Sequence, residues 1–151
     1  RIVVLAARQE AGRGRSGRAW QDPPGAALLL SHLTQGPLPV AVLDRLPERV
    51  AELLLEAFEQ LAPGTLEQVA WKAPNDLVAR EDGAKLAGIL VDVRTRGDVV
   101  EELCVGVGAN LGGAAFVTRD GRQATTLEAL TGVAVSPRAV AELLAVSLAP
   151  R

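Results

Sequence analysis

Residues 85–108 read KLAGILVDVRTRGDVVEELCVGVG, which is two apolar runs separated by a polar turn around Gly97. Branched apolar residues on either side of a glycine turn are typical of paired antiparallel strands. We therefore predict strands over residues 85–93 and 99–108. Two segments before them have the same character and extend the prediction to an antiparallel meander: residues 66–72 and 75–79.

Two further strands are predicted near the N-terminus. Residues 2–7 form an apolar, β-branched run suited to a buried strand, and this run leads into a loop rich in glycine and arginine at residues 9–18. After a Pro-Pro-Gly break, residues 26–33 are typical of a second strand, followed by a connection at residues 36–39. The glycine-rich loop is therefore expected between these two strands.

A long helix is predicted between the strands. Apolar residues recur at helical spacing over residues 50–61. Pro47 lies near the start, where its missing N–H costs least, and Pro63-Gly64 would end the run. This pattern indicates an amphipathic helix packed on a sheet.

Two more helices are predicted in the C-terminal part. Thr125 and Glu128 have the spacing of a capping box, and Gly132 is placed to end that short helix. Ser136 followed by Pro137 is typical of the start of a final helix. Strands grouped together with helices outside them predict an α+β fold, with a mixed, largely antiparallel sheet and helices packed against it.

The composition fits one soluble globular domain over residues 1–151. A net charge of −2 excludes a strongly basic nucleic-acid-binding protein, and no apolar run reaches the roughly 18 residues of a membrane span. The chain also opens without a signal peptide. The single cysteine, Cys104, has apolar neighbours, which favours a buried thiol over a nucleophile. A lone cysteine cannot form an internal disulfide, so a reducing cytoplasm is the expected compartment. His32 has no partner motif and is expected at a strand end or on the surface.

Gly12, Gly14 and Gly17 match the G-x-G-x-x-G pattern of dinucleotide-binding turns. That interpretation requires a helix to begin at the loop, but residues 20–25 read WQDPPG and cannot open one. A kinase-type glycine loop also fits poorly, because no H-R-D or D-F-G sequence is present. Neither nucleotide motif therefore explains the loop.

The same loop carries Arg13, Arg15 and Arg18 between its glycines. Guanidinium groups suit phosphate oxygens, and glycine backbone can approach a ligand closely, so the composition favours a loop that closes on an anion. A solvated loop whose arginines only improve solubility is the alternative. Nucleic acid is a weaker one, because no aromatic residues are interleaved with the arginines.

Residues 9–20 read QEAGRGRSGRAW, which resembles the Q-x-x-G-R-G-R-x-G-R-x-W signature of biotin–protein ligases. In that family the glutamine and the first two arginines surround biotin and its activated carboxyl group, the loop orders over the adenylate, and the tryptophan helps to shape the nucleotide pocket. The resemblance gives these biotin-binding and adenylate-binding roles to seven residues: Gln9, Gly12, Arg13, Gly14, Arg15, Arg18 and Trp20.

Three further segments match the same family in order. Residues 72–76, 85–90 and 106–110 resemble its K-W-P-N-D box, its K-L-A-G-I-L strand and its G-I-G-I-N segment. The resemblance implies the class II synthetase-like fold that biotin and lipoate ligases share, with Asn110 at the adenine site. The matched segments contain both lysines and both asparagines of the chain: Lys72, Lys85, Asn75 and Asn110.

The implied chemistry joins a carboxylate to the α-phosphate of ATP, so a fixed cation is needed where two anions meet. Lys85 is the candidate, with Arg15 as its catalytic partner and Gly88 beside it in the biotin site. Without the motif, Lys85 would be interpreted as an ordinary lysine at the end of a turn. Lys72 resembles a second cation on the phosphate side.

Asn75 and Asp76 offer oxygen ligands and are expected at the ATP site, with Asp76 as a candidate ligand of Mg²⁺. Asp76 as a cap of the turn after Pro74 is the alternative. Ala73 stands where the family has tryptophan, and we predict that Trp71 fills the vacated space, because alternate strand residues share a face. The chain shows no cluster of Cys, His or carboxylates with protein-only metal spacing.

The resemblance implies an ATP-dependent biotin–protein ligase that forms biotinyl-5'-AMP and transfers biotin to a lysine of the biotin carboxyl carrier protein of acetyl-CoA carboxylase or a related carboxylase. Two alternatives stay open, a non-catalytic module that binds biotin or its adenylate, and a lipoate or octanoate ligase of the same fold. The resemblance also allows a homodimer. The family's upstream biotin motif, C-terminal β-barrel and DNA-binding domain have no match in the chain, so the catalytic domain is expected without its N-terminal part and without a DNA partner.

Overall fold

The computed structural model describes residues 1–23 and 25–148. The helices in chain order are η1 (Arg15–Gly17), η2 (Val40–Leu43), α1 (Leu46–Leu61), α2 (Thr65–Gln68), α3 (Leu127–Thr131) and α4 (Pro137–Ser147). The strands are β1 (Ile2–Leu5), β2 (Ala27–Pro39), β3 (Val69–Lys72), β4 (Asp76–Ala79), β5 (Lys85–Arg96), β6 (Val99–Asn110), β7 (Phe116–Val117) and β8 (Gln123–Ala124).

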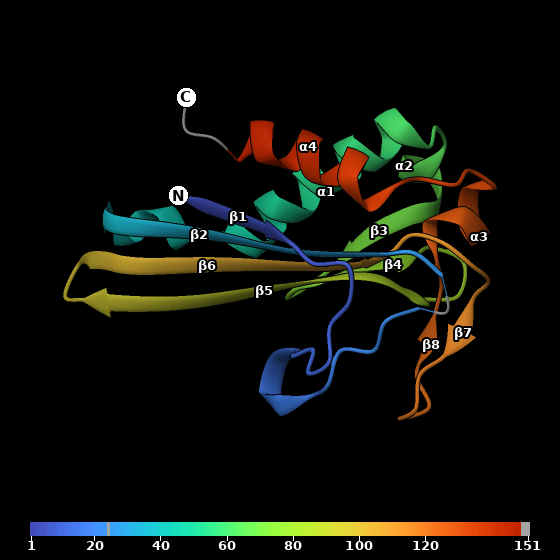
Figure 1. The fold of residues 1–151 in the computed structure, drawn as a ribbon, viewed down its shortest axis with the longest axis horizontal. Coiled ribbons are helices and arrows are strands. Elements are labelled where there is room, and N and C mark those ends of the chain that lie inside the picture. The colour runs from blue at the N-terminus through green and yellow to red at the C-terminus, as the bar shows by residue number, and fades with distance from the viewer. Residues whose placement is uncertain (24, 149–151) are drawn as a thin grey trace.

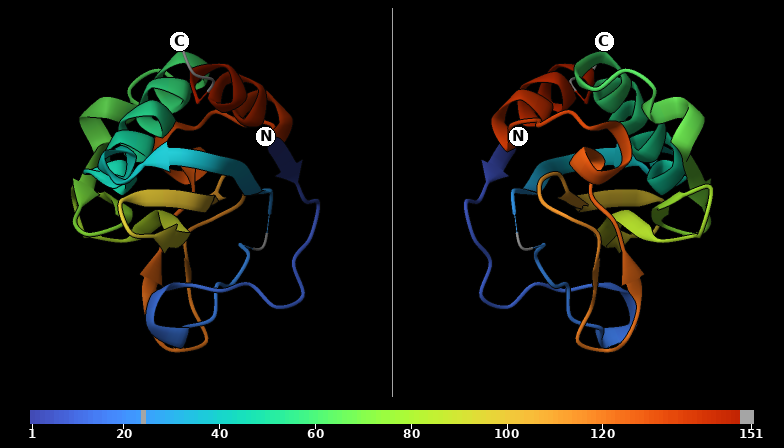
Figure 2. Two further views of the ribbon diagram at one scale, coloured as in Figure 1. Left: turned by 90° about the vertical axis from the view of Figure 1, so that its left-hand side faces the viewer. Right: turned by 90° about the vertical axis from the view of Figure 1, so that its right-hand side faces the viewer.

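The strands form one mixed sheet in which β1-β2-β6-β5-β4-β3 are neighbours in that order. These six strands are antiparallel, and the short β7–β8 hairpin joins through a parallel pairing of β8 with β5. Helices α1 and α4 cover one face of the sheet, whereas the loop after β1 and the β7–β8 hairpin extend beyond the other face, as Figure 1 and Figure 2 show. The predicted α+β fold and antiparallel meander are confirmed.

The hydrophobic core lies between the sheet and the helices. Leu54 and Phe58 of α1 and Leu144 of α4 are fully buried there, and each such side chain contributes about 1.5–3 kcal/mol. From the sheet, Val105 and Val107 of β6 point into the same cluster. Because side chains alternate along a strand, the residues between them face the opposite side of the sheet.

Helix α1 was predicted from its apolar spacing, and Pro47 lies in its first turn as expected. Ser136 caps α4, where its hydroxyl accepts a hydrogen bond from Ala139 N, and Gly132 ends α3 with a φ of 74°. The capping-box prediction at Thr125 was wrong by one residue. Thr126 is the cap of α3, because its hydroxyl accepts from Ala129 N at 3.0 Å.

The structure corrects the prediction that residues 2–7 form a buried strand. Ile2 and Val4 are 58% and 53% exposed, because β1 stands at the end of the strand order and pairs with β2 alone. The prediction of a connection at residues 36–39 was also wrong. β2 continues to Pro39 across an irregularity between Gln35 and Leu38.

Residues 66–72 were predicted as one strand, but the first part is helical. Gly64 enters α2 with a φ of 93°, and the Glu59 carboxylate accepts hydrogen bonds from Gly64 N and Leu66 N. These contacts hold the chain in a helical turn before β3 begins at Val69. The apolar pattern of residues 66–72 did not reveal these hydrogen bonds to Glu59 of α1.

His32 was predicted at a strand end or on the surface, and the structure corrects this as well. It lies within β2, is 8% exposed and has its Nδ1 atom 3.4 Å from Thr34 Oγ1. Burial and the positive charge of Arg1 lower the pKa of His32 below 6.5. In the described part of the chain, no helix is long and apolar enough to cross a membrane.

Candidate active site

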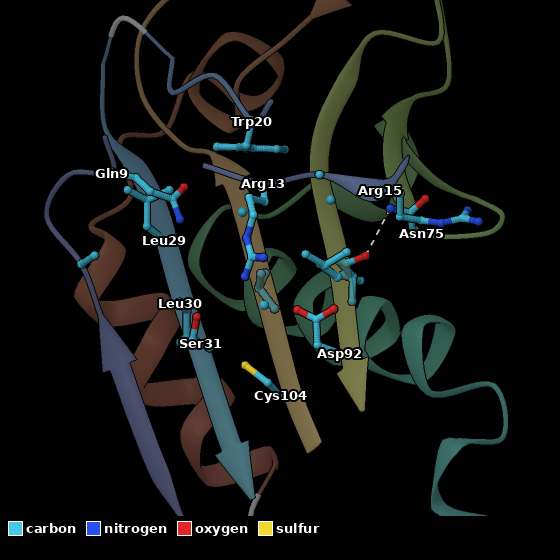
Figure 3. Close-up of a pocket in the computed structure, with 18 of the residues that line it drawn as sticks. Gln9, Arg13, Arg15, Trp20, Leu29, Leu30, Ser31, Asn75, Asp92 and Cys104 are labelled. Carbon is cyan, nitrogen blue, oxygen red and sulfur yellow. Dashed lines mark hydrogen bonds between the residues drawn. The ribbon is translucent and has the colours of Figure 1, made fainter. Parts of the chain in front are cut away.

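A cavity of about 200 Å³ lies on the face of the sheet opposite the helices. Strands β2, β5 and β6 form its floor, and the loop of residues 9–20 forms its roof (Figure 3). The fold places the loop there because β1 and β2 are antiparallel neighbours, so the segment that joins them turns over the edge of the sheet.

The floor consists of rows of residues that the strand register brings together. Gly88 of β5 lies opposite Gly108 of β6, Leu90 lies opposite Gly106, and Asp92 lies opposite Cys104. Since successive residues on one face of a strand are about 7 Å apart, the floor from Gly108 to Cys104 is roughly 14 Å long. The floor of the cavity is therefore elongated along the strands.

The glycines of the floor have two different environments. A methyl group at Gly108 would lie 2.9 Å from the Trp20 indole, and one at Gly88 would lie 3.3 Å from it, so Trp20 rests directly on these two residues. At Gly106 the nearest neighbours of such a methyl group belong to Leu90, at 3.7 and 3.8 Å, which is ordinary contact. The protein's own packing therefore leaves the surface above Gly106 open.

Lys85 stands at the start of β5 and is fixed at both ends. Its Nζ lies 2.8 Å from Asp76 Oδ1 and 5.5 Å from the centre of the Trp20 ring, within the range of a cation–π contact. Its main-chain oxygen accepts hydrogen bonds from Thr125 N at 2.9 Å and from Asn110 Nδ2 at 3.3 Å. The ammonium group is thus presented to the cavity from a fixed base.

Hydrogen bonds within its own backbone hold the loop over the cavity in shape. Gly14 N donates to Arg18 O at 2.7 Å, and Trp20 N donates to Gly12 O at 2.9 Å. A methyl group at Gly12 would meet Gln9 Oε1 at 2.6 Å and Trp20 O at 3.0 Å, so the loop packs closely around this glycine. Arg13 and Arg15 both line the cavity; the Arg13 side chain extends over the sheet, whereas the Arg15 side chain extends outward beside Asn75 (Figure 3).

The structure brings most of the predicted site residues together at this cavity. Those that line it are Gln9, Arg13, Gly14, Arg15, Trp20, Asn75, Lys85 and Gly88. Gly12 lies behind Gln9 and supports the loop. Asp76 forms an ion pair with Lys85 at the edge of the site. The predicted partner of Asp76 was a Mg²⁺ ion.

Besides Asp76, three predicted adenylate residues lie away from the lining. Arg18 and Lys72 are exposed, and their phosphate contacts stay predictions. Asn110 is buried beneath the site, where its Nδ2 atom donates to Thr125 O at 3.1 Å as well as to Lys85 O. Its Oδ1 atom is buried without a hydrogen-bond partner among the described residues.

The structure places Asn75 as a brace for the cavity wall. Its Nδ2 atom donates to Ile89 O at 3.2 Å, and its main-chain oxygen accepts from Ile89 N at 2.8 Å. Ala73 is exposed, whereas Trp71 packs against the hydrophobic core. The replacement of the family tryptophan by Trp71 stays a prediction.

Sequence reasoning missed several residues at the far end of the cavity: Ser31, Leu90, Asp92, Cys104 and Gly106. Cys104 was predicted as a buried thiol, but it is partly exposed and lines the cavity. Burial and the negative charge of Asp92 raise the pKa of the Cys104 thiol, so it is protonated at neutral pH. This protonation agrees with the expectation that Cys104 is not a nucleophile.

Solved structures share this fold. Biotin protein ligase from Leishmania major in complex with biotin superposes with a TM-score of 0.78 and 26% identity, over 96% of this chain and 61% of that one. Biotin protein ligase from Aquifex aeolicus in complex with biotin and ATP has a TM-score of 0.72 and 27% identity, over 97% and 60%. The chain therefore has the class II synthetase-like fold of biotin protein ligases.

A family model for the biotin/lipoate A/B protein ligase family matches residues 1–110, and the chain belongs to this family. Biotin--[acetyl-CoA-carboxylase] ligase from Paracoccus denitrificans is 38% identical over 97% of this chain. The bifunctional ligase/repressor BirA from Escherichia coli is 36% identical over 72% of this chain. The chain spans 60% of the Paracoccus protein and 32% of the Escherichia coli protein.

Proposed function

We propose that the chain is the catalytic part of a biotin–protein ligase. The observation that carries the proposal is one cavity lined by Lys85, Arg13 and Arg15, whose floor has glycine and leucine in the middle and the polar residues Asp92 and Cys104 at the far end. The cationic end suits the carboxylate and phosphate that must react, and the apolar floor suits the ring and alkyl chain of biotin.

In the first step, a carboxylate oxygen of biotin attacks the α-phosphorus of ATP. The new P–O bond forms biotinyl-5'-AMP as the bond to pyrophosphate breaks. Lys85 and Arg15 would lie where these anions meet and where charge gathers on the leaving group. Gln9, Arg13, Gly12, Gly14 and Gly88 would bind biotin.

The nucleotide would extend towards the loop and the residues below it. Trp20 and Asn75 line the cavity near Lys85, and the buried Oδ1 atom of Asn110 is an acceptor without a partner among the described residues. An adenine amino group would supply the missing donor. Arg18 and Lys72, both exposed, would join the phosphates when the loop closes.

In the second step, the ε-amino group of an acceptor lysine attacks the carbonyl carbon of biotinyl-5'-AMP. The amide bond forms, the bond to AMP breaks, and the amine loses a proton. The acceptor that fits is a biotin carboxyl carrier domain of acetyl-CoA carboxylase or a related carboxylase, as the name of the Paracoccus relative supports. A cytoplasmic location and a homodimer also stay predictions.

Mg²⁺ enters the proposal as the ion that accompanies the ATP phosphates. Residues 1–23 and 25–148 contain no group of three His, Cys, Asp or Glu side chains that could hold a metal ion. Asp76, the candidate ligand, has its Oδ1 atom occupied by the Lys85 ammonium. These residues do not fit a protein-held metal site, and no step is assigned to one.

The family also contains lipoate ligases, so the acyl group must be distinguished. Ser31, Asp92 and Cys104 give the far end of the cavity polar groups. Such groups suit the polar ureido ring of biotin better than the aliphatic end of octanoate. This observation favours biotin over the lipoate and octanoate alternatives.

The proposal is tested by incubating the protein with biotin and α-labelled ATP and measuring labelled biotinyl-AMP and pyrophosphate. We expect both products, and we expect Lys85→Met to lower their rate by about 10²–10³-fold, since one preorganised cation is removed. Octanoate and lipoate in place of biotin serve as specificity controls. Binding of biotin without pyrophosphate release would instead identify a non-catalytic binding module.

A further inference from the structure

The ion pair between Asp76 and Lys85 differs from the other ion pairs by its position. It joins the start of β4 to the start of β5 at the inner end of the cavity, with Nζ and Oδ1 2.8 Å apart. The Asp76 Oδ1 atom is shielded from solvent, and only 28% of the Lys85 side chain is exposed. Lys85 is therefore held by a carboxylate in the ligand-free protein.

A lysine ammonium has three N–H donors and a flexible stem of four carbons. Without a fixed partner, such a group samples many rotamers and presents its donors in changing directions. Asp76 confines the ammonium group through the ion pair. The stem is confined on the other side by Trp20, whose ring centre is 5.5 Å from Nζ, and Gly88 leaves room beneath it.

The base of Lys85 is fixed independently of Asp76. Its main-chain oxygen accepts from Thr125 N and Asn110 Nδ2, which join β5 to the segment before α3. Removal of the Asp76 charge would therefore leave the backbone of β5 in place. It would release the ammonium group alone.

We propose that Asp76 is a positioning residue for Lys85, whose ammonium group it holds through the ion pair so that this group faces the substrate carboxylate and the α-phosphate. The proposal rests on the ligase function proposed above. Proximity and orientation of a cation matter most when charge moves, so the loss is expected in kcat more than in substrate binding.

The alternative role, a ligand of Mg²⁺, is disfavoured by charge. A divalent cation bound to Asp76 would lie within a few ångströms of the Lys85 ammonium, and like charges at that distance repel. The described residues also supply no cluster of further carboxylates to offset this repulsion. The two roles predict different responses to the Mg²⁺ concentration.

The experiment compares the wild-type protein with Asp76→Asn and Asp76→Glu in pyrophosphate release from biotin and ATP, over a series of Mg²⁺ concentrations. Asp76→Asn keeps the size of the side chain and removes its charge. We expect its kcat to fall by at least about tenfold at every Mg²⁺ concentration, with KM for biotin and ATP changed less than about threefold. Asp76→Glu restores the charge on a longer arm and should recover part of kcat.

Glu142→Gln is the matched control, because it breaks an exposed ion pair with Arg138 on α4, where the atoms are 2.9 Å apart. It should leave kcat unchanged. Urea unfolding of each variant separates a loss of folded protein from a loss of rate.

Wild-type kcat in Asp76→Asn would overturn the positioning role, and so would a loss that high Mg²⁺ restores, which would make Asp76 a metal ligand. A rise in KM alone would also overturn it. If the wild-type protein itself releases no pyrophosphate, the ligase function fails and the positioning role fails with it. That outcome is distinct from an active wild type with an unimpaired variant.

Discussion

Gly106→Ala tests whether the open part of the cavity floor is the seat of the biotin ring. Gly106 lies in extended β6, and an added methyl group would meet only Leu90, at 3.7 and 3.8 Å. The folded protein should accept the change, and replacing glycine within a strand should stabilise it by about 0.5–1 kcal/mol. A methyl group standing in a close-packed binding site costs about 1–3 kcal/mol, which is about five- to 150-fold in Kd.

The assay is calorimetric titration with biotin, together with urea unfolding of the same preparations. Gly36→Ala is the contrasting variant, because its methyl group would clash with Val100 O, outside the cavity. It should lose stability, whereas Gly106→Ala should lose affinity. Unchanged biotin affinity in a stable Gly106→Ala protein would refute the placement of the ring over this residue.

Three further outcomes follow from individual side chains. Because burial and Arg1 lower the folded-state pKa of His32 below 6.5, the unfolded chain binds the proton first, so the free energy of unfolding should fall as pH decreases through 6.5. His32→Gln should flatten this part of the curve, measured by urea unfolding at a series of pH values, and an unchanged slope would assign it to other groups. Ser136→Ala should destabilise the protein by about 1 kcal/mol through loss of the α4 cap, without change in biotin affinity. The raised pKa of Cys104, caused by burial and by Asp92, should make alkylation by iodoacetamide at neutral pH slower than that of free cysteine. Bound biotin should slow it further, and alkylation at the same rate with and without biotin would place the ligand elsewhere.

The parts of the fold that were predicted are those with local signals. The apolar spacing of α1, the cap at Ser136 and the turn at Gly97 each depend on residues close in sequence. The exposure of β1 depends instead on the strand order, which puts this strand at an edge. The helical turn at Leu66 depends on a hydrogen bond to Glu59, seven residues earlier, and apolar pattern alone does not show it.

The site divides in the same way. The cationic end was predicted, because Arg13, Arg15 and Lys85 lie in continuous motifs. Leu90 and Asp92 follow Gly88 at steps of two along β5, so strand alternation contained a signal for them. Cys104 precedes Gly106 and Gly108 at the same steps along β6, whereas Ser31 had no such signal, because only the pairing of β2 with β6 brings it beside the cavity.

The alternation along β6 has a consequence for how this protein changes over evolutionary time. Val105 belongs to the core, whereas Cys104 and Gly106 on either side of it line the cavity. A mutation at one set leaves the packing of the other largely intact, although the two sets are adjacent in the gene. Substitutions at the cavity-facing positions of such a strand can therefore change which ligand is bound. Selection for folding preserves the core-facing positions between them.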